Sequence, residues 1–345
     1  MANRWTKTFL SLVVFQVLIS LPLLVVICTD VNSYQPLEYE LHAKINHVRV
    51  EVLWFIFFEI WRLWLVIDAL IHCSSLTVIT CGVLTLFSAG FGALECIETK
   101  KMINTKKYVD DPLKRNLVLE FILTGSITAL LIPTIYVVYR LALDYGWQTY
   151  RKVGAHLNVQ SMYFLVNCFS LILKIDTFFE VLIMVFYMLL GVTDGTALTW
   201  IPGIMALVTL FGLFFARKSV SDESHWKMIV FIVIQVAFIG MSAWMLFQRT
   251  DPDDPWYIVL FYGSTSILMT IVTLVFAIKC QMNFGKGLKP YVHWSLFGKK
   301  RPVTTPITNQ SILLDDADLE YTGYTVDSDL QQAILKQNRI SRDQL

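Results

Sequence analysis

Two apolar stretches of this chain carry charged residues whose spacing could support chemistry. The first reads VLWFIFFEIWRLWLVIDALIH and the second reads FSLILKIDTFFEVLIMVF. Their charged side chains are Glu59, Arg62, Asp68, Lys174, Asp176 and Glu180. A charge at the centre of a lipid bilayer costs roughly 2.5–3.5 kcal/mol on insertion scales. If these stretches cross a membrane, their charges must be paired, hydrated or close to the membrane surface.

Helical spacing indicates which of these groups can meet. Glu59 and Arg62 are three residues apart, so they share one face of a helix and are expected to form an ion pair. Asp176 and Glu180 are four residues apart and also share a face, but their charges are alike. This second pair requires a cation from another helix, a bound proton or water. Lys174 is two residues from Asp176 and points to another side, so we do not expect it to be the partner.

Three interpretations of these charges stay open from the residues alone. The charges could pair and anchor helices near the membrane surface, line a substrate or proton pathway, or form a catalytic site. Depth bears on the choice, because the apolar run 163–192 spans about 45 Å as a helix, more than one perpendicular crossing. If its membrane portion begins near Leu171, Lys174 and Asp176 lie close to the cytosolic surface. Glu180 then lies one turn deeper.

The composition indicates which solvent surrounds these stretches. Hydrophobic residues make up 55% of the 345 residues, and charged residues only 16%. This apolar share is well above that of water-soluble domains, so the chain is predicted to be a membrane protein. The formal net charge of +1 provides no overall basic surface for nucleic acid, which we do not expect as a partner.

The apolar runs predict the fold, because a membrane-spanning helix needs about 20 mostly apolar residues. The runs that qualify are approximately 9–29, 52–72, 75–96, 117–140, 165–190, 197–216, 227–247 and 256–279. We therefore predict an all-α fold, a polytopic transmembrane helix bundle of about eight spans, or seven if the first is cleaved as a signal peptide. Two of these helices, 52–72 and 165–190, are expected to carry charge in their interiors.

Basic residues in short loops indicate the orientation, because cytosolic loops carry an excess of Lys and Arg. Their distribution favours a cytosolic location for both ends of the chain. One stretch opposes this orientation: residues 98–116, ETKKMINTKKYVDDPLKRN, form a basic loop on the opposite side. Either its charges are tolerated there, or one helix before it has been miscounted.

Three segments follow from the change in composition along the chain. Residues 1–283 are predicted to form the multi-pass transmembrane helical domain. Residues 284–301 mix basic and aromatic side chains and are read as a juxtamembrane segment. Residues 302–345 are polar with an acidic patch and are expected to form a disordered cytosolic tail. The expected partners are the lipid bilayer and, through the tail, cytosolic proteins.

Motifs typical of enzymes and cofactor sites are missing from the sequence. It contains no P-loop, no dinucleotide fingerprint after a strand, no HExxH and no GxSxG. Its six cysteines are scattered singly, and His42 and His47 have no third metal ligand arranged near them in the sequence. We therefore expect no enzymatic activity, no catalytic residue, no cofactor and no metal.

The segment DYGWQTYRKVGAHLNVQSMYFLVNCFSLILKIDTFFEVL resembles the signature region of a fungal family of uncharacterised Golgi apparatus membrane proteins. That region runs Tyr-Gly-Trp-x-x-Tyr-Lys-x-x-Gly-Ala, then Met-Tyr, then Leu-Lys-Phe-Asp-x-Phe-Phe. The matching residues are Tyr145, Gly146, Trp147, Tyr150, Lys152, Gly154, Ala155, Met162, Tyr163, Leu173, Lys174, Asp176, Phe178 and Phe179. Ile175 stands where an aromatic is usual, and Glu180 adds a charge. The resemblance implies a multi-pass protein of the Golgi membrane, with no established reaction.

The expected function is a non-enzymatic structural or trafficking-related component of the Golgi or secretory pathway. The alternative is a small-solute or proton-coupled transporter that uses Asp68, Asp176 and Glu180. A receptor-like bundle is a third hypothesis, since the number of spans says nothing about signalling. A transporter needs Asp176 or Glu180 to face a wet cavity shared with the charges of the run 52–72.

Overall fold

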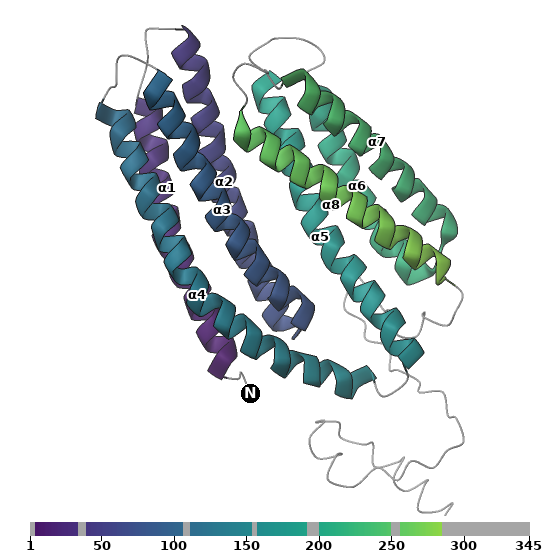
Figure 1. Ribbon diagram of the computed structural model, residues 1–345. Coiled ribbons are helices and arrows are strands. Elements are labelled where there is room, and N and C mark those ends of the chain that lie inside the picture. The colour runs from purple at the N-terminus through teal and green to yellow at the C-terminus, as the bar shows by residue number, and fades with distance from the viewer. Residues whose placement is uncertain are drawn as a thin grey trace, which may run out of the picture. The chain divides into compact units, whose positions relative to one another are not determined.

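The computed structural model describes residues 4–33, 39–105, 111–153, 157–191, 200–249 and 256–284 of the chain. These ranges form helices and contain no β-strand. The helices are α1 (Arg4–Ser33), α2 (Tyr39–Ile71), α3 (Ser75–Thr105), α4 (Asp111–Val153), α5 (Leu157–Gly191), α6 (Trp200–Asp222), α7 (His225–Arg249) and α8 (Tyr257–Met282) (Figure 1). Each of the expected apolar runs overlaps one of these helices, and residues 197–199 of the run 197–216 lie outside the described residues.

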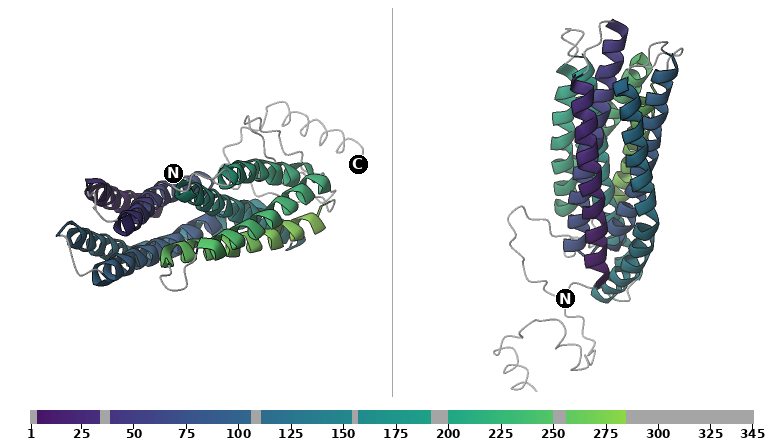
Figure 2. Two further views of the ribbon diagram at one scale, coloured as in Figure 1. Left: turned by 90° about the horizontal axis from the view of Figure 1, so that it is seen from above. Right: turned by 90° about the vertical axis from the view of Figure 1, so that its left-hand side faces the viewer.

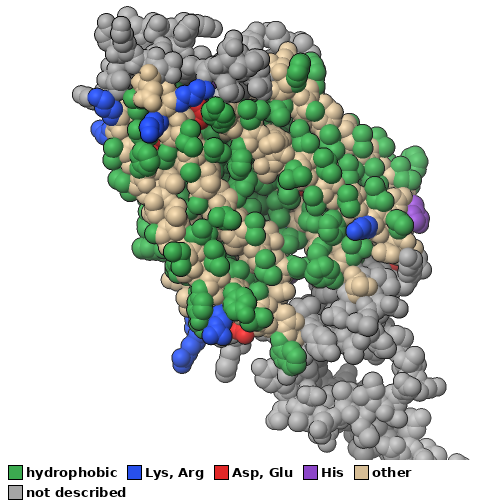
Figure 3. Space-filling view, viewed as in Figure 1, with side chains coloured by type: hydrophobic (Ala, Val, Ile, Leu, Met, Phe, Trp, Pro, Cys, Tyr) green, Lys and Arg blue, Asp and Glu red, His purple; other side chains and the backbone are tan. Residues whose placement is uncertain are grey.

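Most of these helices are long and apolar enough to cross a membrane. The six that meet this description are α1, α3, α4, α6, α7 and α8. The other two, α2 and α5, are as long and hold the charged residues of the two apolar stretches. On the face shown in Figure 3, hydrophobic side chains cover the middle of the helical region, and most Lys and Arg side chains lie near its ends. The protein is therefore the expected all-α, polytopic transmembrane helix bundle.

The helices pack as two groups of four in chain order. In the first half, α1–α4, each helix packs against the next and α4 returns to α1. In the second half, α5–α8, the helices pack in the same way and α8 returns to α5. Figures 1 and 2 show successive helices running in opposite directions. α1 thus begins, and α8 ends, at one end of the bundle, which we call the terminus end; the other is the far end.

The basic stretch 98–116 is not the loop that the sequence predicts. Both α3 and α4 extend into it, so most of the stretch is helical and lies at the far end of the first half. Lysine and glutamate are good helix formers, which lets these helices continue beyond the apolar run. Arg115 pairs with Asp30 of α1, and Lys101 lies over the ring of Tyr257, 5.0 Å from its centroid. The described ranges contain no additional helix that would indicate a miscounted span.

The two halves meet through aromatic side chains of α2, α3, α5 and α8. Trp61 of α2 stacks on Phe178 of α5 with ring centroids 4.1 Å apart. Phe87 of α3 stacks on Phe261 of α8 with centroids 4.9 Å apart. Such ring pairs contribute about 0.5–1.5 kcal/mol each beyond their buried area. The interface is therefore apolar over much of its length.

Two of the expected segments lie largely outside the described residues. Only Phe284 of the juxtamembrane segment 284–301 is described, and no residue of the tail 302–345. The helices of the described ranges all belong to the first of two units of the chain, residues 1–298. The expected boundary after residue 283 and the roles of both segments stay predictions.

Candidate functional site

The first half contains a fully buried ion pair. Arg62 Nη2 donates to Glu59 Oε2 over 2.6 Å, and both side chains are 0% exposed. Two hydroxyls of α3 complete the site: Arg62 Nη1 donates to Thr85 Oγ1 at 3.1 Å, and Ser88 Oγ donates to Glu59 Oε1 at 2.6 Å. The ion pair expected from the three-residue spacing is confirmed. Because its charges cancel, this site is suited to holding α2 against α3 rather than to chemistry.

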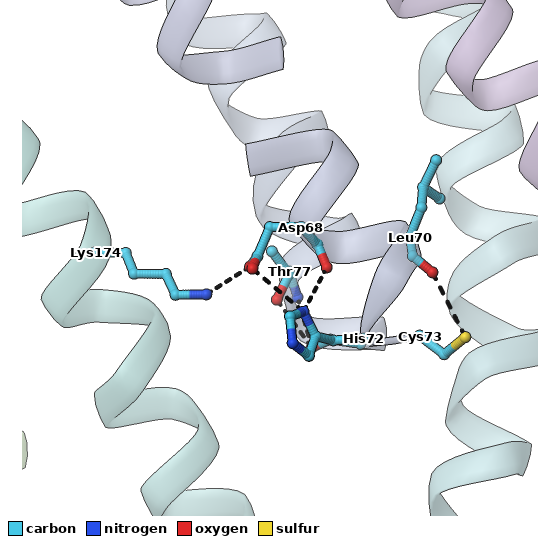
Figure 4. Close-up of polar contacts among 7 residues, drawn as sticks. Asp68, Leu70, His72, Cys73, Thr77 and Lys174 are labelled. Carbon is cyan, nitrogen blue, oxygen red and sulfur yellow. Dashed lines mark hydrogen bonds and ion pairs between the residues drawn. The ribbon is translucent and has the colours of Figure 1, made fainter. Parts of the chain in front are cut away.

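A second ion pair links the two halves. Lys174 Nζ of α5 donates to Asp68 Oδ2 of α2 over 2.5 Å, and the two side chains are only 18% and 16% exposed. His72 Nδ1 lies 3.2 Å from Asp68 Oδ1, so three side chains converge at this point (Figure 4). Lys174 therefore points away from Asp176, as its spacing predicts. Spacing could not identify Asp68 as the partner, because that depends on how α2 docks against α5.

Asp176 and Glu180 lie in the interior of the second half, with 0% and 1% of their surfaces exposed. Gln235 of α7 donates from Nε2 to Asp176 Oδ2 at 3.1 Å. The Thr270 hydroxyl of α8 lies 3.1 Å from Asp176 Oδ1 and 3.3 Å from Glu180 Oε1. Among the residues that the structure describes, no Lys, Arg or His forms an ion pair with either carboxyl group. The two acidic groups share this site without a cation from those residues.

The Thr270 hydroxyl has more acceptors around it than it has hydrogens. Besides the two carboxyl oxygens, it lies 2.9 Å from the backbone oxygen of Ser266. A threonine hydroxyl donates one hydrogen bond and accepts up to two. If Asp176 and Glu180 are both ionised, two of the three acceptors face the hydroxyl with no hydrogen between them. A proton on either carboxyl group resolves half of this conflict, because the protonated group then donates to the Thr270 oxygen and only one acceptor is left without a hydrogen.

Three further carboxyl groups are buried in the first half, toward its far end. Glu51 of α2 accepts from Nε1 of Trp256, and Glu120 of α4 accepts from Thr99 Oγ1 over 2.9 Å. Glu95 of α3 lies close enough to Glu51 and Glu120 for their charges to repel. We call Glu51, Glu95 and Glu120 the carboxyl cluster. The expectation that only α2 and α5 carry interior charge is wrong, because Glu95 and Glu120 are buried within the spanning helices α3 and α4.

Several acceptor atoms near this cluster have no hydrogen-bond partner in the described part of the chain. They are Oε1 of Glu95, Oε2 of Glu120 and Oδ1 of Asn116. The indole Nε1 of Trp54, three residues from Glu51, is a donor without a partner in the same region. In the described ranges, no group of three or more His, Cys, Asp or Glu side chains is arranged for a metal ion. Both acidic sites place carboxyl groups close together without a cation among the described residues.

The two buried pairs are separate sites. The hydrogen bonds of Glu59 and Arg62 go to α3, whereas those of Asp176 and Glu180 go to α7 and α8. The transporter hypothesis stated from the sequence requires Asp176 or Glu180 to share a cavity with the charges of α2. The described contacts do not bring these groups together. Gln235 and Thr270, which sequence reasoning missed, lie far from α5 in the chain.

Comparison with known proteins supports the resemblance seen in the sequence. The chain is similar to a UPF0658 Golgi apparatus membrane protein from Schizosaccharomyces pombe, with 24% identity over 156 residues. The match covers 43% of this chain and 43% of that protein, so the chain spans less than half the length of the relative. No family model matches the chain, and no solved structure matches it significantly. The relative and the apolar helices together place this chain among the multi-pass membrane proteins of the Golgi apparatus, with the expected resemblance to an uncharacterised fungal family.

Proposed function

We propose that this protein is a proton-coupled carrier of small solutes in the Golgi membrane, with its proton site in the second half alone and not in a cavity shared with the charges of α2. The observation that supports the proposal is the buried pair of Asp176 and Glu180, which meets Thr270 and Gln235 but no described cation. One bound proton relieves the repulsion between the carboxyl groups and supplies one of the two hydrogens that the acceptors around Thr270 lack. A group that gains and loses a proton inside a membrane can couple proton movement to solute movement.

The division into two halves suits such a carrier. Secondary transporters commonly move one group of helices against another around a site near the middle of the membrane. Here the halves meet through aromatic stacking, such as that of Trp61 on Phe178, and through the ion pair of Lys174 and Asp68. Contacts of this kind can shift while each group of four helices keeps its own packing.

The structural or trafficking role expected from the sequence stays a prediction, as does the expected absence of enzymatic activity. The trafficking role depends on the tail 302–345, which lies outside the described residues. Removing residues 302–345 is the direct test. A trafficking component should then change its location or its binding partners while the helices stay folded, whereas a carrier should keep its transport activity.

Transport can be tested with the full chain in lipid vesicles that contain a pH-sensitive dye. Amino acids, sugars and inorganic ions are added one at a time outside, under an inward proton gradient. We expect at least one solute to accelerate proton entry, and Asp176→Asn and Glu180→Gln each to abolish that acceleration. Asp222→Asn is the matched control, because this carboxylate pairs with Lys227 at the end of α6.

Infrared spectroscopy supplies a second measurement that needs no solute. A protonated carboxyl group has a C=O stretching band distinct from that of a carboxylate. At neutral pH we expect a part of this band to disappear in Asp176→Asn and in Glu180→Gln. A spectrum that shows both groups ionised would contradict the proposal, because the pair would then hold no proton to transport.

A further inference from the structure

α8 carries a row of buried hydroxyl groups. Tyr262, Ser266 and Thr270 follow one another at four-residue intervals, so they share one face of the helix and lie about 6 Å apart along its axis. Each of the three is 0% exposed. α8 packs against α5 in the second half and against α3 in the first half. The row is therefore in a position to connect acidic groups of the two halves.

Two of these hydroxyls have no hydrogen-bond partner among the described residues. They are the phenolic oxygen of Tyr262 and Oγ of Ser266. An unsatisfied buried polar group costs about 1–3 kcal/mol, and most buried hydroxyls are therefore paired. Packing alone does not explain two such groups in succession, because Phe and Ala would fill the same places without this cost. Bridging water molecules would satisfy both groups.

One end of the row lies beside the carboxyl cluster. The Tyr262 ring stacks on Trp54 with centroids 3.7 Å apart and meets Phe91 edge-on at 4.8 Å. Trp54 follows Glu51 by three residues, and Phe91 precedes Glu95 by four, so the ring is held within about one helical turn of both carboxyl groups. The charges of Glu95, Glu59 and Glu51 also act on the Tyr262 hydroxyl, and two of these three belong to the carboxyl cluster.

The other end of the row lies at the carboxyl pair of the second half. Thr270 Oγ1 is within hydrogen-bond distance of both Asp176 and Glu180. Ser266 is one helical turn from Thr270, on the side of Tyr262. The three hydroxyls thus span the distance between two acidic sites that share no direct contact in the described residues.

We propose that Tyr262, Ser266 and Thr270 form a proton relay between the carboxyl cluster and the pair of Asp176 and Glu180. This inference rests on the proposed function, since it describes how a proton reaches the pair. Each hydroxyl oxygen accepts a proton from one side and releases its own proton to the other. One O–H bond forms and one breaks, so the hydroxyl is unchanged and one proton has moved. A water molecule bridges each gap of about 6 Å along the helix.

The relay can be tested by removing single oxygen atoms from the full chain in lipid vesicles. Tyr262→Phe keeps the stacking on Trp54, and Ser266→Ala removes only a hydroxyl. The matched controls on the same helix are Tyr257→Phe and Ser264→Ala, at positions outside the row. After a rapid change of external pH, infrared spectroscopy follows the protonation of the carboxyl groups with time. Thermal unfolding checks that each variant is folded.

We expect Tyr262→Phe and Ser266→Ala each to slow the protonation change by about tenfold, because water replaces a lost hydroxyl only in part. The final extent of carboxyl protonation should equal that of the unmodified protein. The two control variants should reach it at the same rate as the unmodified protein. Rates equal to that of the unmodified protein, with the carboxyl band still present, would overturn the relay and leave the proposed function intact. A missing carboxyl band in the unmodified protein would overturn both.

Discussion

The two halves of the molecule each bury a pair of charged residues. The pairs lie at nearly the same level along the helix axes, but they differ in charge balance. Trp61 and Phe178 stack across the interface; Arg62 directly follows the first, and Glu180 comes two residues after the second. The pair in the first half combines opposite charges and is held by two hydroxyls of α3. The pair in the second half combines like charges that share one hydroxyl of α8.

This difference separates two uses of charge inside an apolar bundle. An oppositely charged pair such as Glu59 and Arg62, held by hydroxyls of the neighbouring helix, fixes how two helices pack, and it responds little to its surroundings. A pair of carboxyl groups without a counter-charge responds to the availability of protons, which is the property of a functional site. Charge balance, rather than burial, therefore distinguishes the candidate site from the structural pair.

The largest effect is expected when the balanced pair is broken on one side. Arg62→Gln leaves Glu59 buried without its counter-charge and should lower the free energy of unfolding by about 3–5 kcal/mol. Adding Glu59→Gln restores the balance, so the double variant should be more stable than Arg62→Gln alone. Thermal unfolding of the purified protein measures all the variants. Simple additivity of the two single changes would show that the residues do not act as a pair.

A smaller loss is expected when a hydroxyl that supports the balanced pair is removed. Ser88→Ala takes away the hydrogen bond to Glu59 and should lower the free energy of unfolding by about 1–2 kcal/mol. Ser126→Ala is the control, because that hydroxyl donates only to a backbone oxygen of its own helix. Equal stability of the two variants would mean that the α3 hydroxyls contribute nothing specific to the pair.

The unbalanced pair should behave in the opposite way. Glu180→Gln removes a like charge and provides an amide donor beside Thr270, so we expect the free energy of unfolding to change by less than about 1 kcal/mol. The same unfolding assay applies, with Glu59→Gln as the contrasting variant. A loss as large as that of Arg62→Gln would reveal a counter-charge at Glu180 and remove the distinction between the halves.

The smallest effect is expected at the ion pair between the halves. Lys174 and Asp68 are partly exposed, so Asp68→Asn should lower the free energy of unfolding by about 0.2–1 kcal/mol. The loss should shrink as salt is added, because salt screens exposed charges more than buried ones. Unfolding at low and high ionic strength tests this. A loss that does not depend on salt would show that Lys174 and Asp68 are shielded from solvent in the same way as Glu59 and Arg62.

Much of the fold could be predicted, because apolar length alone indicates a spanning helix. The pairing of Glu59 with Arg62 was also predictable, since both lie on one helix and the spacing decides it. The C-terminal end of α3 and the N-terminal end of α4 could not be predicted from hydropathy, because Lys and Glu extend a helix beyond the point where hydropathy falls. Glu95 and Glu120 were overlooked since each is one acidic residue within an otherwise apolar run.

The partners of the candidate site could not be predicted for a different reason. Asp176 is 59 residues from Gln235 and 94 from Thr270, and Lys174 is 106 from Asp68. Contacts over such separations depend on the order and rotation of the packed helices. Threonine and glutamine are common in membrane helices without any special role, so nothing in their local sequence distinguishes these two.

The closure of each half on itself has a consequence for how the protein is made. Once residue 153 has left the ribosome, the emerged chain contains α1–α4 and can form the contact of α4 on α1. By then Glu59, Arg62, Thr85 and Ser88 are all in the membrane and can neutralise one another. Asp68 and the aromatic faces of α2 and α3 gain their contacts with α5 and α8 only after the second half has been inserted. Membrane insertion can thus proceed in two stages, with the aromatic surface as the docking site for the later one.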